Sequence, residues 1–556
     1  MLTSVKSVGA SALRVDTIRS HQSDIREIDA RHVTNDVDLL AEIGYKQELK
    51  RKFSTLQVFG VAYSIMGLLP SIASTTATGL TAGPAGFVWS WFVSGIFIVG
   101  IGIGMAELGS AIPTSGGLYY WTFHYAPEKI RVPLSYMIGL SNTLALCGGL
   151  CSVNYGFALE VLAAAYMNSD GTFVSTTGKT YGVFAACVVS HILVTCLTSN
   201  MISKMQTTSI ICNSGIIVLF FIAVPIGTAK AKGFNDGEFI FGTVQNYSDW
   251  PTGWQFMLSM MTAIWTIGAF DSCVHMSEEA HNASKSIPVG IIGSTMVCWI
   301  VGFFICICMA ACMSSDVASV IDSPTGFAMA QIVEDSLGKK WGVAMMVLIA
   351  CCQWLMGSSL LTALSRQIWA FARDDGLPFS RYIKVVDKKL RVPLRAVAFG
   401  GALALTIGCL TLAGSTAANA LFSLGVAGNY IAWGTPIFLR LTSGKDKFKP
   451  GPFYLGDTLS PIVNWIVCCW MIFVLFLCMF PGSKTVDKET MNYTVVINCG
   501  VWVLAMVYFY TYKFKYFHGP RSNLNDDAAE DIRYVEGYVD PKSSGEKAST
   551  PDVEKA

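Results

Sequence analysis

The sequence predicts an all-α membrane protein that crosses the bilayer many times. Of its 556 residues, 52% are hydrophobic and 14% are charged, whereas soluble domains carry about 25% charged residues. The mean hydropathy is +0.49. Twelve runs are apolar and long enough to form transmembrane helices, each of which needs about 20 residues. Two of these runs, the first and the sixth, are interrupted near their middle by small and polar residues.

The predicted spans and the positions of Lys and Arg give a topology. The spans cover residues 56–77, 84–108, 132–163, 181–198, 207–227, 253–273, 288–313, 341–370, 393–412, 417–439, 461–480 and 491–512. An even number of spans places both termini on one side of the membrane. Basic residues gather on that side, at Lys50, Arg51 and Lys52 and in the loop after the eighth span. Because cytoplasmic loops carry an excess of Lys and Arg, both termini are predicted to be cytoplasmic.

The interruption in the first span is the most informative segment, reading YSIMGLLPSIA over residues 63–73. An unsatisfied backbone group is costly in hydrocarbon, so a broken helix persists only where it is buried in protein or lines a cavity. Two broken helices at corresponding positions in two halves of a chain point to a transporter substrate site near the bilayer midplane. The candidate substrate-binding residues of this segment are Ser64, Ile65, Met66, Gly67 and Leu68.

The interruption in the sixth span reads AIWTIGAFDS over residues 263–272. It supplies Trp265, Thr266 and Gly268 as further candidate substrate-binding residues. An ionisable group inside a span is costly and is by default a functional hypothesis. Asp271 would lie about one turn into the second half of this span if that half begins near Gly268. It is a candidate coupling residue or, alternatively, a capping partner for the broken helix.

Few other ionisable residues lie in or beside spans. Glu107 ends the second span and is a candidate proton carrier, with a structural role beside the following glycine-rich loop as the alternative. Lys204 precedes the fifth span, where it is either a snorkelling anchor or a substitute for a coupling cation. Glu160 and His191 are interpreted as packing or interface residues.

Composition argues against several other function classes. The 17 cysteines lie mostly within spans, without paired CxxC motifs, and such cysteines behave as small apolar residues. No metal site and no cofactor are therefore expected. The net charge of +1 gives no indication of nucleic-acid binding. The seven histidines are scattered, which argues against a membrane enzyme, and two broken helices in one chain favour a gated central site over the pore-lining rings of a channel.

Polar segments flank the spans. Residues 1–50 and 516–556 have a composition that cannot bury enough apolar surface to fold, so both are predicted to be disordered cytoplasmic tails. Residues 51–445 form the predicted transport core of spans 1–10, and residues 446–515 hold spans 11 and 12. Tail residues such as Lys6 and Lys547 suit trafficking or ubiquitin machinery, and a passive solvated end is the alternative.

Three motifs resemble signatures of the amino acid–polyamine–organocation superfamily. They are the run from Glu107 to Tyr120, the segment from Glu278 to Pro288, and the stretch from Ser365 to Pro378. Within the superfamily the chain is most similar to the fungal amino acid/choline permeases and to their γ-aminobutyric acid (GABA) subgroup. Segments that carry this similarity include residues 41–51 and the run PGPFYLG at 450–456.

This resemblance implies the leucine-transporter fold. Spans 1–5 and 6–10 would form inverted repeats, spans 1 and 6 would be unwound at their centres, and spans 11 and 12 would be peripheral. In that fold Trp265 gates the substrate and Asp271 is the acidic group of span 6. Asn142 on span 3 and Ser358 on span 8 are expected, by position, to line the site.

The resemblance also implies a function. It indicates a secondary active transporter for GABA, with putrescine and related amines as further substrates, working by alternating access and coupled to protons. A polyamine or choline permease of the same fold is one alternative, and a non-transporting amino-acid sensor is an alternative from a different class. The resemblance favours the vacuolar membrane, with the plasma membrane as the alternative.

The residue types suggest how such a site would hold GABA, a zwitterion whose charges are separated by three carbons. Backbone N–H groups of Met66, Gly67 and Leu68 would face the carboxylate, because a helix N-terminus favours anions. The ammonium group would face carbonyls at the end of the first half of span 6 and the ring of Trp265, as a cation–π contact. Ordinary packing is the alternative role for Trp265.

Overall fold

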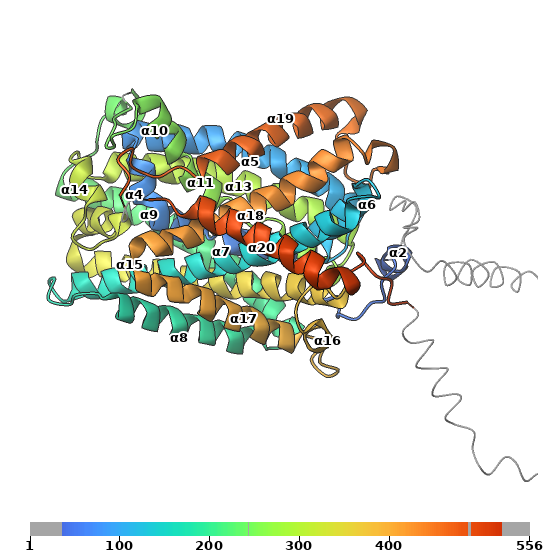
Figure 1. Ribbon diagram of the computed structural model, residues 1–556. Coiled ribbons are helices and arrows are strands. Elements are labelled where there is room, and N and C mark those ends of the chain that lie inside the picture. The colour runs from blue at the N-terminus through green and yellow to red at the C-terminus, as the bar shows by residue number, and fades with distance from the viewer. Residues whose placement is uncertain (1–35, 243, 488–490, 525–556) are drawn as a thin grey trace, which may run out of the picture.

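The computed structural model describes residues 36–242, 244–487 and 491–524, apart from the side chains of 415–417 and 419–421. In these ranges the chain is helical and forms no strand, only one isolated bridge between Phe53 and Ala280. Figure 1 shows the long helices running side by side in one bundle. Ten helical stretches, one of which is Thr55–Leu80 taken across its interruption, are long and apolar enough to cross a membrane. The predicted all-α membrane fold is confirmed.

The long helices follow the predicted spans in order. They are α3 (Thr55–Met66), α4 (Leu68–Leu80), α5 (Gly83–Ala111), α7 (Arg131–Asn168), α8 (Thr177–Thr195), α9 (Ser199–Ala231), α13 (Ala283–Cys312), α15 (Ala328–Arg373), α17 (Leu394–Gly408), α18 (Ser415–Leu441), α19 (Gly456–Leu477) and α20 (Thr494–Thr511). Shorter helices are α2 (Asp36–Glu42), α6 (Gly117–Tyr125), α10 (Thr252–Ser259), α11 (Met261–Thr266), α12 (Ser272–His275), α14 (Val317–Ile321) and α16 (Ser380–Ile383). Short 3-10 or π segments are η1 (Glu238–Gly242), η2 (Cys409–Ala413), η3 (Lys445–Lys447) and η4 (Lys513–Lys515).

Two predicted spans are not among the ten apolar helices. The sixth is divided among α10, α11 and α12, none of which is long enough to cross a bilayer alone. The tenth corresponds to α18, which has 27 residues. The total of twelve spans and the inverted repeat therefore stay predictions.

Both predicted interruptions are present. Gly67 has φ +39° and ψ 62° and separates α3 from α4. This left-handed conformation favours glycine because it has no Cβ. In span 6 the chain leaves helical geometry after α11, and Ala269 has φ +55° before α12 begins. The two short pieces α4 and α11 pack against each other, so the two breaks are neighbours in space.

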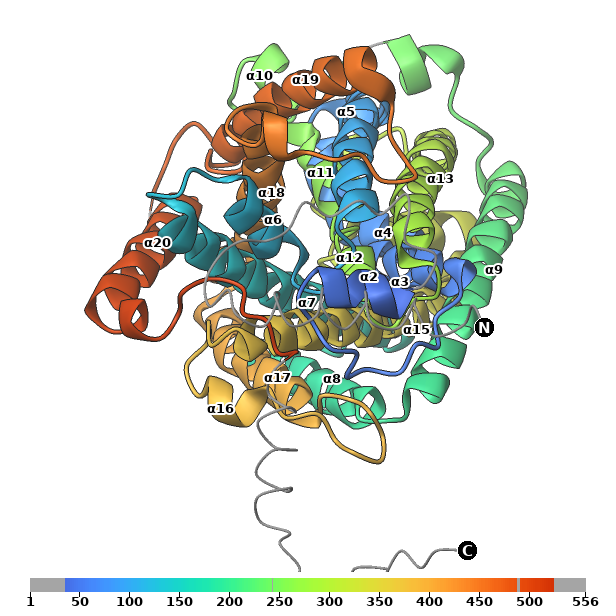
Figure 2. The same ribbon diagram turned by 90° about the vertical axis from the view of Figure 1, so that its right-hand side faces the viewer.

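The helices around the breaks hold them in place. The helix α3 packs against α9, α13 and α15, while α7 packs against α15 and α18. Seen end-on in Figure 2, α4, α11 and α12 lie within the bundle, whereas α8, α9, α19 and α20 lie toward its perimeter. The two broken helices are therefore surrounded by protein, as exposed backbone at this depth requires.

The structure differs from the prediction of disorder at the inner edges of both tails. Within residues 36–50, α2 and the segment after it pack on the bundle, and Leu40 and Tyr45 are each 1% exposed. The Asn523 N–H donates to the Gly44 carbonyl at 3.2 Å, which joins the last described residues to this segment. A few well-placed apolar side chains suffice here because the bundle supplies the partner surface. The rest of both predicted tails, 1–35 and 525–556, lies outside the described residues.

Candidate functional site

A cavity of about 40 Å³ lies beside the two helix breaks. Its lining residues are Ile65, Gly149, Val153, Ile264, Trp265, Thr266, Gly268, Ala269, Met356, Leu360, Gly425, Val426, Asn429, Tyr430 and Trp433, from α3, α7, the α11 break, α15 and α18. Four of them, Ile65, Trp265, Thr266 and Gly268, are predicted site residues. The volume of this cavity is far below the roughly 300–1,000 Å³ of small-molecule sites, so an amino acid would enter this site only when its walls move apart.

Four buried polar atoms of lining residues have no hydrogen-bond partner in the described part of the chain. They are Thr266 Oγ1, Asn429 Oδ1, Tyr430 Oη and Trp433 Nε1. Such an atom costs about 1–3 kcal/mol when it is left unpaired, and most buried polar atoms are paired. Three oxygens that can accept, two of them hydroxyls that can also donate, and one indole N–H that donates suit a small ligand with both an ammonium and a carboxylate group.

Asn429 and Trp433 are not among the residues predicted from the sequence. They lie four residues apart on α18, and therefore on one face of that helix. The signal available in the sequence was an asparagine within an otherwise apolar span. It was weak, because an asparagine and a tryptophan at helical spacing are equally typical of helix packing.

The span 1 break offers donors at the start of α4. Gly67 N–H is already bonded to the Tyr63 carbonyl at 3.2 Å, and Pro70 has no N–H. The first bond of α4 runs from Ser71 N–H to the Gly67 carbonyl at 2.8 Å. Helix geometry therefore leaves the N–H groups of Leu68 and Leu69 as the donors of this end. Leu68 is a predicted donor, while Gly67 N–H is engaged and Met66 ends α3.

Two predicted lining residues face other partners. Ser64 Oγ bonds to Ser359 Oγ at 2.8 Å and to Ser209 Oγ, which ties α3 to α15 and α9. Ser358 Oγ donates to the Leu355 carbonyl of its own helix at 2.8 Å. Neither lines the cavity, and Met356 and Leu360 form its α15 wall instead.

Asp271 and Asn142 form a second buried group. Asn142 Nδ2 donates to Asp271 Oδ2 at 2.9 Å, and His275 Nε2 lies 3.4 Å from the same oxygen. All three side chains are at most 1% exposed. His275 Nδ1 is 3.0 Å from the Ser115 carbonyl, whereas Asp271 Oδ1 and Asn142 Oδ1 have no partner among the described residues. His275 is not among the predicted site residues, although its spacing of four from Asp271 was visible in the sequence.

Glu107 is bound on several sides. Its Oε2 accepts from Arg440, from Ser460 Oγ at 2.7 Å and from Asn464 Nδ2 at 3.1 Å. Its Oε1 accepts from the Leu455 N–H at 3.1 Å. These contacts join α5 to α18 and α19, which is a structural role with partners other than the glycine-rich loop.

The remaining ionisable candidates differ in their surroundings. Lys204 is exposed on α9, away from the cavity, as an anchoring lysine would be. His191 Nε2 lies 2.8 Å from the Trp354 carbonyl. Glu160 is fully buried on α7, and neither carboxylate oxygen has a partner in the described ranges. An isolated buried carboxylate is costly, so Glu160 is expected to be neutral.

The three sequence motifs behind the family resemblance meet in space. Ser115 N–H donates to Glu278 Oε1 at 3.2 Å, and Arg373 bonds to both oxygens of Glu278, at 2.9 and 3.1 Å. The neighbouring Glu279 accepts from Arg366 Nε at 2.7 Å. These buried contacts join the segment between α12 and α13, the α5–α6 loop and the end of α15 at the end of the bundle where both described chain ends lie.

Comparisons with known proteins agree with this architecture. Residues 53–503 match the family model described as "Amino acid permease". The chain is 56% identical over 520 residues to the GABA-specific permease of Saccharomyces cerevisiae, covering 93% of this chain and 91% of the yeast protein. It is 33% identical over 515 residues to an uncharacterized amino-acid permease of Schizosaccharomyces pombe, covering 92% and 93% of the two chains.

A third relative comes from Candida albicans. That protein, provisionally named a polyamine transporter, is 29% identical over 546 residues, which cover 95% of each chain. The match to the family model and the likeness to these permeases extend over nearly the whole membrane bundle. The chain belongs to the amino acid permease family of membrane transporters.

Proposed function

We propose that this protein is a secondary active transporter of GABA that works by alternating access and is coupled to protons. The observation that carries the proposal is the small cavity beside two helix breaks, where buried acceptors and a buried donor have no partner among the described residues. The likeness to a GABA-specific permease supports the choice of substrate.

The site suggests an orientation for the substrate. The carboxylate would lie at the start of α4, where Leu68 and Leu69 offer N–H groups and the helix dipole favours an anion. The ammonium group would face Asn429 Oδ1 and the ring of Trp265, which is partly exposed and packs against Phe422 with ring centroids 5.0 Å apart. Ile65 and Ile264 would contact the carbon chain between the two charges.

The charge of the cavity favours GABA over putrescine and choline. The lining residues in the described part of the chain are all uncharged. A zwitterion has no net charge, whereas putrescine would bring two positive charges and choline one into a site without a counter-charge. Because an unpaired charge in a buried site is costly, we expect both amines to bind more weakly than GABA.

Proton coupling is assigned to Asp271. It is a buried carboxylate immediately before α12, directly after the break whose residues line the cavity. Asn142 and His275 hold one carboxylate oxygen, so protonation of the other would change the interactions that position α12. We place both termini in the cytoplasm and the protein in the vacuolar membrane.

Equilibrium binding tests the substrate assignment. The purified full chain is titrated with GABA, putrescine and choline by calorimetry, and GABA is expected to bind most tightly. Asn429→Leu removes the acceptor within the cavity and should weaken GABA binding, whereas Asn498→Leu changes a buried amide on α20 outside the cavity and should leave it unchanged. Tighter binding of putrescine or choline would contradict the assignment.

A further inference from the structure

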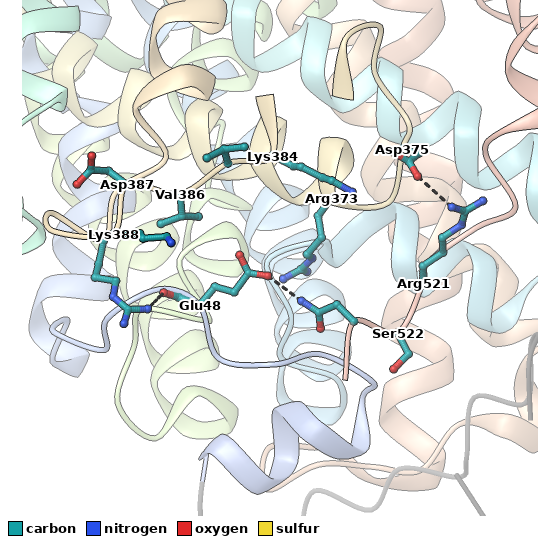
Figure 3. A pocket seen from close by; sticks show the side chains of 12 residues that line it. Glu48, Arg373, Asp375, Lys384, Val386, Asp387, Lys388, Arg521 and Ser522 are labelled. Atoms are coloured by element: carbon teal, nitrogen blue, oxygen red, sulfur yellow. Dashed lines mark hydrogen bonds and ion pairs between the residues drawn. The ribbon is translucent and has the colours of Figure 1, made fainter. Parts of the chain in front are cut away.

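A second, larger cavity lies at the end of the bundle where the described chain ends meet. It measures about 500 Å³, within the range of about 300–1,000 Å³ of small-molecule sites. Its lining residues are Glu48, Arg373, Asp375, Lys384, Val385, Val386, Asp387, Lys388, Arg391, Arg521, Ser522 and Asn523. Figure 3 shows these side chains arranged around it. They come from the segment before α3, the end of α15, the loop between α16 and α17, and the last described residues.

The lining carries an excess of positive charge, with five basic and three acidic residues. Some of these charges are paired, as in Arg521 and Asp375 at 3.0 Å. Lys384 and Lys388, by contrast, donate no side-chain hydrogen bond and form no ion pair within the described ranges. Burial raises the pKa of Glu48, although Arg373 opposes the shift.

A buried donor in this cavity also lacks a partner. Arg373 is 7% exposed, and its Nε has no hydrogen-bond partner in the described part of the chain, although its other nitrogens bind Glu278. The guanidinium is enclosed by the rings of Tyr45 and Trp369, 3.8 and 4.6 Å away, so the two unpaired ammonium groups of Lys384 and Lys388 are the groups able to bind phosphate oxygens. A cavity of this size is larger than a single phosphate group and has room for a ring that carries several phosphate groups.

Exposed apolar side chains lie beside the charged lining. Phe379 is 74% exposed, Tyr382 66% and Val385 43%. They belong to α16 and its flanking residues, which Figure 2 shows at the perimeter of the bundle, next to α17. Aromatic residues at the perimeter are typical of the membrane–water interface. The cavity is therefore placed where a lipid headgroup can enter it from the side.

We propose that this cavity binds the headgroup of an anionic phospholipid that carries phosphate monoesters, with its glycerol and acyl region against Phe379 and Tyr382. Lys384 and Lys388 contact the phosphates. Anionic lipids are concentrated in the cytoplasmic leaflet, and the inference rests on the proposed cytoplasmic position of this end. A bound headgroup would join the N-terminal segment, the α16–α17 loop and the C-terminal segment.

Binding of a fluorescent short-chain phosphatidylinositol bisphosphate to the detergent-solubilised full chain tests this proposal. The double variant Lys384→Ala/Lys388→Ala should bind roughly thirty-fold more weakly, since each basic residue contributes a factor of about five. The matched control is Lys129→Ala/Lys445→Ala, which removes two exposed lysines of the same end that do not line the cavity. An equal loss in both variants, or no binding by the wild type, overturns the proposal.

A second arm distinguishes a lipid from a soluble phosphate ligand. Phe379→Ser/Tyr382→Ser should weaken the lipid probe while leaving binding of soluble inositol trisphosphate unchanged. If the soluble compound binds the wild type as tightly as the lipid, and the aromatic variant binds the lipid normally, the lipid assignment is wrong. GABA binding by calorimetry should stay unchanged in both double variants, so failure here is separable from failure of the transport assignment.

Discussion

Gly67 is the residue on which the span 1 site depends most. It adopts φ +39°, and a Cβ at this position would lie 2.8 Å from the Sδ of Met356, a residue that lines the cavity beside the helix breaks. We expect Gly67→Leu to abolish GABA binding while the protein still inserts into the membrane. Calorimetry and membrane fractionation measure the two properties.

A lipid-facing glycine provides the control for this change. Gly215 on α9 is exposed, and a Cβ there would meet nothing within 4 Å. Gly215→Leu should bind GABA normally. Normal binding by Gly67→Leu would show that the substrate does not depend on this break.

Trp265 tests recognition of the ammonium group. A cation–π contact contributes about 0.5–2 kcal/mol, which is about two- to thirty-fold in affinity. Trp265→Phe keeps an aromatic face and should weaken GABA binding modestly, while Trp265→Leu should weaken it more. A steric gate would treat the two variants alike and change the maximal rate rather than the apparent affinity, so transport kinetics separate the two roles.

Asp271 tests proton coupling. Asp271→Asn keeps the shape and an acceptor for Asn142 but removes the titratable group, so we expect a flattened pH profile of GABA uptake. Glu107→Gln is the comparison, because Glu107 is a carboxylate with a structural role: it should lower thermal stability and leave the pH profile unchanged. An unaltered profile in Asp271→Asn would remove this residue from coupling.

At the scale of elements, the break in span 1 is stabilised by a side chain. Ser71 Oγ donates to the Met66 carbonyl at 2.6 Å, where α3 ends and regular helix bonds stop. Ser71→Ala leaves that buried carbonyl with one partner fewer, and we expect a loss of about 1–3 kcal/mol in stability. A thermal unfolding assay on the solubilised protein measures it.

Ser94 gives the matched comparison for this prediction. It is also fully buried, but its Oγ bonds at 2.7 Å to the Ser90 carbonyl within the regular helix α5. That carbonyl keeps its helix bond when the hydroxyl is removed, so Ser94→Ala should cost less. Equal losses in the two variants would contradict a special role for Ser71 at the break.

The positions of the helix breaks could be predicted from the sequence, but their extents could not. Gly67 and Gly268 mark the breaks because glycine within an apolar span has a clear physical cost. The helix α12 is only four residues long, and the chain after it pairs with Phe53 through Ala280, a tertiary contact that the sequence does not display. The α18 wall of the cavity was not predicted for the same reason. Asn429 can be recognised as a lining residue only once the packing of α18 against the other helices is known.

For the whole molecule, the fold class and the family could be predicted, because the apolar composition and the family motifs are distributed along most of the chain. The meeting of three motifs in one buried ion-pair cluster was not, since Ser115, Glu278 and Arg373 are far apart in sequence. The order found in residues 36–50 was not predicted, because the sequence of this short polar segment does not show the bundle surface against which it packs.

The central claim is that this family member transports GABA and that a proton gradient drives the transport. Purified protein is reconstituted into vesicles, and uptake of labelled GABA is followed with and without an imposed pH gradient, beside labelled putrescine and choline. We expect uptake of GABA above that of the two amines, stimulated by the gradient and lost in Gly67→Leu. Binding of GABA without uptake in any gradient would instead identify a sensor on this fold and contradict the account.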